Sequence, residues 1–227
     1  GATPPNLIVR GDLRKDQYLL RTNIFLQNEG NFQFTDVADQ TKTADYEFGW
    51  GAVFQDFSNK GRLDIALAQN YIGFPIHRFL KLPCRLLMQL PDRTFAAIEE
   101  AAHVKNPYYA ISPLIADFNG NGFMDLIYTN LDGPLRVFIN QGGQNHFLKV
   151  ILKNEPASLG ATVSVITGSD KTFTSFFVPT QGLCTYQTNA LIFGLGKETI
   201  VKKVKIKFTN GQELSFDHPT INSTLYV

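Results

Sequence analysis

One nine-residue pattern occurs twice in this chain, and it constrains the fold more than any other feature. The first copy runs from Asp56 to Asp64 and the second from Asp117 to Asp125, so that the two lie 61 residues apart. Each copy stands between two short apolar runs, which are typical of strands. A strand–loop–strand unit that recurs at a fixed spacing predicts a repeat architecture.

A hairpin precedes each loop at the same spacing. Residues 22–38 predict two strands around an Asn-Glu-Gly-Asn turn, and residues 85–95 repeat them, with Phe95 standing 61 residues after Phe34. A third, partial copy begins at Arg136. Repeats of about 40–60 residues with several strands each predict the blades of a β-propeller.

The second loop has the side chains of a cation site. Its oxygen-bearing residues are Asp117, Asn119, Asn121 and Asp125, and Gly122 allows the backbone to turn sharply. Calcium takes six to eight oxygen ligands, from carboxylates, amides and backbone carbonyls. The pattern predicts a calcium site, and the alternative is an Asx-rich turn that needs no metal.

The first loop departs from this pattern. Asp56, Ser58 and Asp64 match the ligand positions, but Lys60 stands where a third oxygen ligand would be. We therefore expect no calcium at the first loop. The Lys60 ammonium either takes the place of the cation beside Asp56 and Asp64 or points to solvent.

From Asn145 onward the sequence predicts a separate module. Short alternating runs are separated by turns, including the Asn210-Gly211 hairpin signal and a glycine-containing corner at Phe193–Gly196. The lysines of residues 201–208 alternate with apolar residues and predict the solvent-facing side of a strand. This pattern of short strands separated by turns favours a small β-sandwich or barrel-like module.

Composition excludes several classes of function. A net charge of +1 and the absence of a basic run argue against a nucleic-acid partner. No apolar stretch approaches the length of a membrane span, and no signal peptide begins the chain, whose first five residues resemble a linker. Cys84 and Cys184 fit no metal motif, and we expect two unpaired, mostly buried thiols.

No catalytic constellation is evident. The sequence has no nucleophile elbow, phosphate-binding loop or zinc motif. The four histidines are scattered along the chain. We therefore predict no enzyme activity, no catalytic residues and no cofactor other than calcium.

These landmarks together resemble a known pair of families. Residues 22–143 are similar to FG-GAP/VCBS repeats, the blades of integrin-α-type β-propellers, and residues 144–227 are similar to the ASPIC/UnbV domain. That domain follows such repeats in cartilage acidic protein and its bacterial relatives. The motifs that carry the resemblance are Asn28–Val37, Gly49-Trp-Gly51, both loops, Asn145–Val150, Leu159-Gly-Ala, Gly182–Tyr186, Phe193-Gly-Leu-Gly and Asn210-Gly-Gln.

The resemblance implies an all-β protein with a partial β-propeller over residues 1–143, two blades complete and one partial, followed by the C-terminal module over residues 144–227. It implies that calcium is held by the four oxygen-bearing side chains of the second loop and by the carbonyl oxygen of Phe123. The two carboxylates of the loop carry just enough negative charge to neutralise one calcium ion, so we expect weak binding.

The expected function is that of a non-enzymatic, calcium-stabilised binding or adhesion module, extracellular or at the cell surface or in the periplasm. The alternative is an accessory or substrate-binding region of a carbohydrate- or lipid-active enzyme. The partner expected is a protein or a glycan. Because a propeller usually has four to eight blades, we expect further blades or another chain to cover the open edge.

Overall fold

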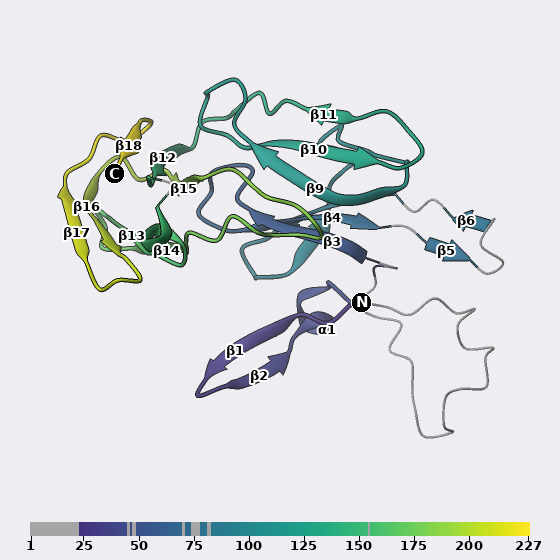
Figure 1. Cartoon of the computed structure of the whole chain (residues 1–227), viewed down its shortest axis with the longest axis horizontal. Helices are drawn as coiled ribbons and strands as arrows, with labels where there is room; N and C mark the ends of the chain where they lie inside the picture. Colours follow the sequence, from purple (N-terminus) through teal and green to yellow (C-terminus); the bar gives the residue numbers. More distant parts are fainter. Residues whose placement is uncertain are drawn as a thin grey trace. The chain divides into compact units, whose positions relative to one another are not determined.

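The computed structural model describes residues 23–44, 46, 49–69, 71–73, 78–80, 83–153 and 155–227. Almost all regular elements of the described residues are strands (Figure 1), which confirms the all-β prediction. The exceptions are a short helix, α1 (Ala38–Thr41), and the 3₁₀ turn η2 (Pro156–Ser158). The linker predicted at residues 1–5 lies outside the described residues.

The chain forms two compact units, and each of them is assembled from three segments that are not consecutive in the sequence. The first comprises the described parts of residues 1–53, 64–113 and 128–136, and the second comprises residues 54–63, 114–127 and 137–227. Both repeated loops therefore lie in the second unit together with the C-terminal region, except that Asp64, the last residue of the first loop, belongs to the first unit. The predicted domain boundary between residues 143 and 144 stays a prediction.

The repeated strands have matching positions and lengths. The sheet orders are β3-β4-β7-β8, β11-β10-β9, and the hairpins β1-β2 and β5-β6. Strands β3 and β9 begin 61 residues apart and so do β4 and β10, and in each pair the two strands have equal length. The bounds are β1 (Leu26–Gly30), β2 (Gln33–Asp36), β3 (Gly49–Gln55), β4 (Asp64–Gln69), β5 (Tyr71–Gly73), β6 (Arg78–Leu80), β7 (Arg85–Gln89), β8 (Phe95–Ala97), β9 (Ala110–Ala116), β10 (Asp125–Asn130) and β11 (Arg136–Phe138).

Both predicted hairpins form, but the first turn lies at Asn31 and Phe32 rather than over residues 28–31, because β1 runs on to Gly30. Strand β1 pairs with β2, and β7 pairs with β8, in antiparallel register. In the first unit Ile65, Leu87 and Phe95 form a small buried cluster, and Phe25 packs edge-on against the Phe95 ring at 5.9 Å. A complete or partial propeller remains a prediction.

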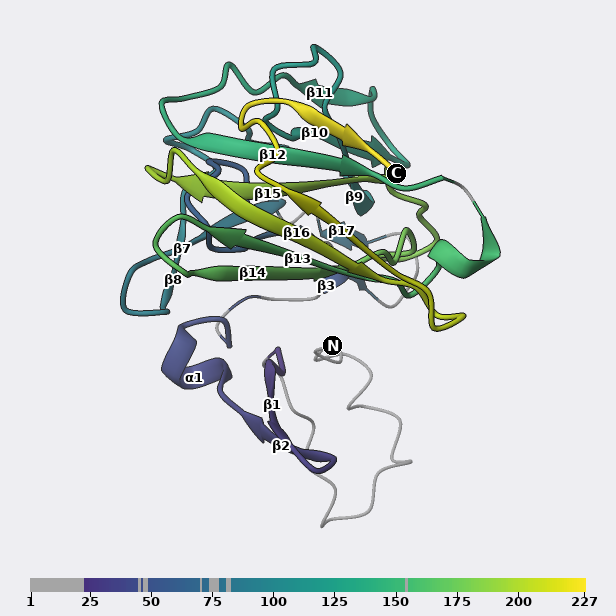
Figure 2. The same ribbon diagram turned by 90° about the vertical axis from the view of Figure 1, so that its left-hand side faces the viewer.

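The C-terminal part of the second unit is a β-sandwich. One sheet has the order β15-β12-β18 and the other β14-β13-β16-β17 (Figure 2). Strands β12 and β18 are parallel, while the pairs whose register is known in the second sheet are antiparallel. The bounds are β12 (His146–Ile151), β13 (Thr162–Thr167), β14 (Thr172–Phe176), β15 (Ala190–Gly196), β16 (Val201–Lys207), β17 (Glu213–Asp217) and β18 (Thr224–Tyr226).

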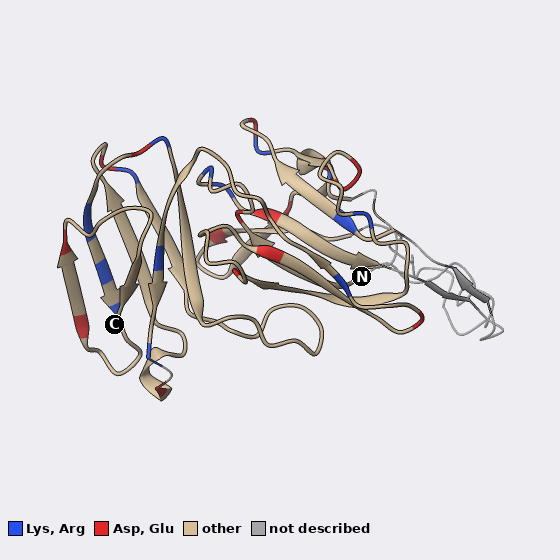
Figure 3. Ribbon diagram, turned by 90° about the horizontal axis from the view of Figure 1, so that it is seen from above, with Lys and Arg blue, Asp and Glu red and all other residues tan. Residues whose placement is uncertain are grey.

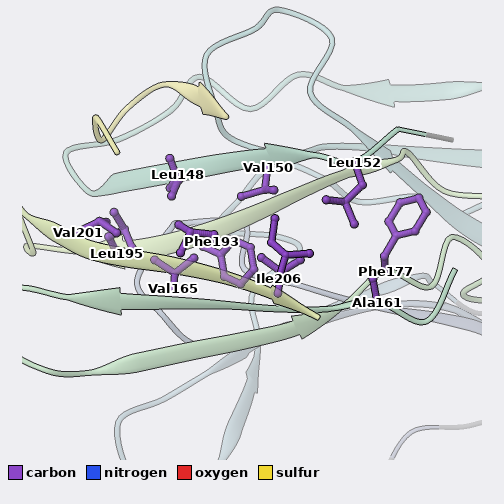
Figure 4. Close-up of a cluster of buried hydrophobic side chains, with 12 residues drawn as sticks. Leu148, Val150, Leu152, Ala161, Val165, Phe177, Phe193, Leu195, Val201 and Ile206 are labelled. Carbon is purple, nitrogen blue, oxygen red and sulfur yellow. The ribbon is translucent and has the colours of Figure 1, made fainter. Parts of the chain in front are cut away.

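One hydrophobic core lies between these two sheets (Figure 4). Strand β12 contributes Leu148 and Val150, and β16 contributes Val204 and Ile206, all of them buried. The alternate residues of β16 are lysines, and two of them pair with β17 as Lys203–Asp217 at 3.0 Å and Lys207–Glu213 at 3.8 Å. The predicted solvent-facing side of this strand is confirmed, and its charges stand out in Figure 3.

The predicted corner at Phe193–Gly196 is wrong. These residues are the end of strand β15, which pairs with β12 up to Gly196 opposite His146. Gly194 allows close packing, because a Cβ there would lie 2.2 Å from Asp56 Oδ2 and 2.5 Å from Asn59 Cα, and Gly196 ends the strand with a φ of 61°. A glycine inside a strand often marks the close approach of another backbone segment.

Candidate functional site

The two repeated loops begin with the same backbone arrangement. The Asp56 carboxylate accepts a hydrogen bond from the Gly61 N–H at 2.6 Å, and the Asp117 carboxylate accepts one from the Gly122 N–H at 3.0 Å. Both glycines have positive φ, 83° and 82°. The loops are therefore two copies of one turn, closed by an aspartate that binds the N–H of a left-handed glycine five residues later.

The last aspartate of each loop also has a matching role. Asp64 Oδ1 accepts the Gln89 N–H at 2.9 Å, and Asp125 Oδ1 accepts the Asn140 N–H at 2.7 Å. Asp125 Oδ2 accepts the Phe118 N–H at 2.7 Å. Both aspartates are buried, so these bonds satisfy carboxylates that have lost their water.

The amide oxygens of the second loop are engaged within the loop. Asn119 Oδ1 accepts the Asn121 N–H at 3.1 Å, and Asn121 Oδ1 accepts the Phe123 N–H at 2.9 Å. The amide groups of both asparagines donate to the Asn140 carbonyl, at 3.4 and 2.8 Å. The two bonds to backbone N–H groups within the loop are the local bonds expected of an Asx-rich turn, whereas the two to Asn140 tie the loop to a later segment.

A lysine of the C-terminal sandwich reaches the second loop. The Lys149 ammonium forms an ion pair with Asp117 Oδ2, and the side chains are 13% and 3% exposed. Strand β12 alternates, so that Leu148 and Val150 face the core while Lys149 and Phe147 lie on the opposite face. The Phe147 ring packs on Gly122, where a Cβ would lie 2.0 Å from the ring.

With Lys149 in this position, the side-chain oxygens of the second loop are engaged almost entirely by protein donors. Every predicted side-chain ligand oxygen accepts a protein hydrogen bond except Asp117 Oδ1, which is buried and has no hydrogen-bond partner. An ammonium already lies on the same carboxylate. Among the described residues no group of three or more His, Cys, Asp or Glu side chains could hold a metal ion. Calcium at this loop stays a prediction from the sequence.

The first loop is anchored differently. Asn59 is fully buried with φ of 53°, and its Nδ2 donates to the Gly122 carbonyl at 2.8 Å. Its own carbonyl accepts the Gly196 N–H at 2.8 Å. The Ser58 carbonyl accepts a bond from Asn145 Nδ2 at 2.8 Å. The Lys60 N–H donates to Asp56 Oδ1 at 3.1 Å, and the predicted role of the Lys60 side chain stays a prediction.

Asn140 joins the two loops, and the sequence analysis did not identify it. Its Nδ2 donates to the Phe57 carbonyl at 2.8 Å and to the Met124 carbonyl at 3.2 Å. Its Oδ1 accepts the Gly142 N–H at 3.0 Å. The only signal available in the sequence was its place in the third, partial repeat beginning at Arg136.

A cleft of about 320 Å³ lies within the second unit, between the first loop and the edges of the sandwich. Strands β14 and β15 line it, and each is the edge strand of its sheet among the described residues. The size is at the lower end of the range for small-molecule and peptide-side-chain sites. Edge strands present unpaired backbone groups, which can bind an added strand.

The cleft has a mixed lining: apolar side chains alternate with polar ones, among them Asp56, Gln181 and Gln187, and Arg62 is its one cation. Exposed Leu63, Phe176 and Val178 line it, as does Arg62 from the first loop. The Nε atom of Arg62 is buried and has no hydrogen-bond partner. A buried N–H without an acceptor is unfavourable, so the site is suited to a ligand that brings an acceptor.

The cysteines are both free, as expected, but only one is buried. Burial raises the pKa of the Cys84 thiol to about 11, so it stays protonated at neutral pH. Cys184 is exposed, which corrects the expectation that both thiols are mostly buried.

Comparison with known proteins supports the C-terminal part of this description. The fold and the site define an all-β protein that ends in a β-sandwich against which two repeated loops pack. Residues 152–227 match the family model described as ASPIC and UnbV, which confirms the resemblance of this region. No curated protein matches the chain. Among the described residues no helix has the length and apolar character required to cross a membrane.

Proposed function

We propose that this chain is a non-enzymatic binding or adhesion module, the C-terminal part of a larger extracellular propeller protein, and that it binds an extended peptide in the cleft beside β14 and β15. The 61-residue repeat, which resembles FG-GAP/VCBS blades in sequence, and the ASPIC and UnbV match over residues 152–227 support the class of module. The observation that carries the site is Arg62, which lines the cleft together with residues of β14 and β15 and whose Nε is buried without a hydrogen-bond partner.

The chemistry of the cleft defines the peptide. An added strand receives main-chain hydrogen bonds from a sheet edge, while its alternate side chains occupy pockets. The exposed Phe176 and Val178 supply apolar contact on the β14 side. Arg62 offers a guanidinium, which binds carboxylates through paired N–H donors. The ligand is therefore an extended peptide with apolar side chains and one acidic side chain.

Selection from a random-peptide display library on the immobilised chain tests this proposal. We expect enriched peptides to carry an acidic residue, and Arg62→Gln and Phe176→Asp to weaken binding of a fluorescent selected peptide by about tenfold or more. Tyr226→Asp is the matched control, because Tyr226 is an exposed aromatic residue on β18 that does not line the cleft. Selected peptides that bind all three variants equally would refute the cleft as the site.

Two further assays separate the binding function from its alternatives. A glycan array that gives binding where the peptide library gives none would replace the peptide with a carbohydrate ligand. A hydrolase screen that detects turnover, lost on substitution of a single carboxylate, would instead support the accessory region of an enzyme. Neither result depends on calcium, and the calcium-stabilised part of the prediction is tested by melting the intact chain with calcium or with a chelator.

A further inference from the structure

The Lys149–Asp117 ion pair is largely withdrawn from water. Its side chains are 13% and 3% exposed, whereas Arg85 in its pair with Glu99 is 31% exposed and Lys203 in its pair with Asp217 is 38% exposed. An ion pair removed from water persists only when its geometry and its hydrogen bonds compensate for the lost hydration. Breaking a buried pair therefore destabilises the fold, whereas breaking a surface pair has little effect on stability.

The position of the ammonium is that of a cation in the loop. Asp117 is the first residue of the repeated pattern, and its Oδ2 accepts both the Gly122 N–H and the Lys149 ammonium. Its Oδ1 has no partner and is buried. Asp125, the last residue, is satisfied by two backbone N–H groups. The charge that needs compensation is therefore that of Asp117.

We propose that the Lys149 ammonium is the resident cation of the second loop, supplied by the C-terminal sandwich in place of a divalent metal ion. The donor oxygens that a metal would use are engaged in the loop's own turn, and the site beside Asp117 is filled. Calcium binding would require Lys149 to leave a buried partner, which the intact chain resists. The second loop is therefore held closed by the sandwich of its own unit and needs no metal.

Lys149 is one of two residues on the same face of β12 that hold the second loop against the sandwich. Phe147 packs against Gly122 and Phe123, with the two rings 6.4 Å apart, and Lys149 lies two residues further along the same face of β12. The strand thus presents one apolar and one charged contact to the loop. A freely exchanging metal ion would give the loop no such preference for this strand.

Thermal melting of the intact chain, with calcium or with a chelator, tests the proposal. We expect the melting temperature of the natural chain to be the same in both. Lys149→Met leaves Asp117 buried without compensation and should lower the melting temperature in chelator by about 6–12 °C. Calcium should restore part of this loss and bind Lys149→Met in calorimetry, because the substitution clears the cation position.

Two variants complete the design. Lys153→Met is the matched control, because Lys153 is exposed and lies just beyond the same strand; its melting should not respond to calcium. Asp117→Asn combined with Lys149→Met removes both charges, so this double variant should melt above Lys149→Met and lose the calcium response. If Lys149→Met alone does not fold, recovery of folding in the double variant gives the same answer.

Two results would overturn the proposal. One is a calcium-dependent rise in the melting temperature of the natural chain equal to that of Lys149→Met, which would show that the metal and the lysine do not compete. The other is no calcium binding to a folded Lys149→Met, which would show that the ammonium does not occupy a cation position. Peptide binding in the cleft is measured separately, so failure here leaves the proposed function standing.

Discussion

The first and second loops share one backbone but are fixed by different contacts. In both, an aspartate accepts the N–H of a left-handed glycine five residues later, and a second aspartate accepts an N–H from a following segment. The first loop packs against glycines of β15 through the buried Asn59. The second packs against the outer face of β12 through Gly122 and Asp117. A duplicated turn thus keeps its internal hydrogen bonds while its surroundings determine what compensates its charge.

The comparison also shows that residues at equivalent positions of the two loops have different roles. Asn59 in the first loop and Gly120 in the second occupy equivalent positions, and both have positive φ, 53° and 72°. Asn59 is fully buried and bonds the Gly122 carbonyl, whereas a Cβ on Gly120 would meet nothing within 4 Å. Both loops have the same left-handed backbone conformation at this position, but only Asn59 makes a buried side-chain hydrogen bond there.

The largest effect on stability is expected from Gly122→Ala. The new Cβ would lie 2.0 Å from the Phe147 ring and would hold a strained φ, so we expect a loss of about 3 kcal/mol or more in the free energy of unfolding. Gly120→Ala is the control, with strain but no clash, and should lose about 1 kcal/mol. Urea denaturation measures both. Equal losses would mean that the second loop does not pack on β12.

A smaller loss is expected from Asn140→Ala. The substitution leaves the Phe57 and Met124 carbonyls without their donor and removes the acceptor of the Gly142 N–H. We expect a loss of about 2–3 kcal/mol in the free energy of unfolding, since each unsatisfied group costs about 1–3 kcal/mol when buried and less when half-exposed. Gln89 gives its backbone N–H to the first repeat as Asn140 does to the second. Gln89→Ala should change stability by less than about 0.5 kcal/mol, and a loss as large as that of Asn140→Ala would contradict a role specific to Asn140.

The smallest effect is expected from exchanging the equivalent residues. Asn59→Gly removes the bond to the Gly122 carbonyl but keeps the left-handed conformation, so we expect a loss of about 1–2 kcal/mol. Gly120→Asn places an asparagine in an open position where its conformation is tolerated and should be close to neutral. Chemical denaturation of both variants measures the asymmetry, and a neutral Asn59→Gly would show that the two loops are interchangeable.

The sequence predicted the elements well where periodicity and turn chemistry agree. The 61-residue spacing predicted that β3, β4, β9 and β10 would match, and they do. Alternation in residues 201–208 predicted which side of β16 is solvated. Phe193–Gly196 failed because glycines there accommodate the first loop rather than turn the chain, and local sequence does not distinguish these causes.

The candidate site was predicted only in part, and for a clear physical reason. The ligand residues of the second loop were found from local spacing, since an Asx-rich turn is a property of consecutive residues. Lys149 and Asn140 lie outside the loop and were not identified. The pairing of Lys149 with Asp117 spans 32 residues and depends on how β12 is placed against the loop. Arg62 belonged to the predicted loop, but only the fold shows that its Nε is buried without a partner.

By itself, the sequence determined a duplicated β-rich chain, the conformation of its two loops and the alternation of its C-terminal strands. These follow from residue periodicity and from the φ angles that glycine and asparagine adopt, which are local properties. Tertiary structure alone decided that an ammonium from β12 lies on Asp117 and that two sheet edges border one cleft. Such contacts join residues far apart in the chain, and their energies depend on the burial that only the folded packing creates.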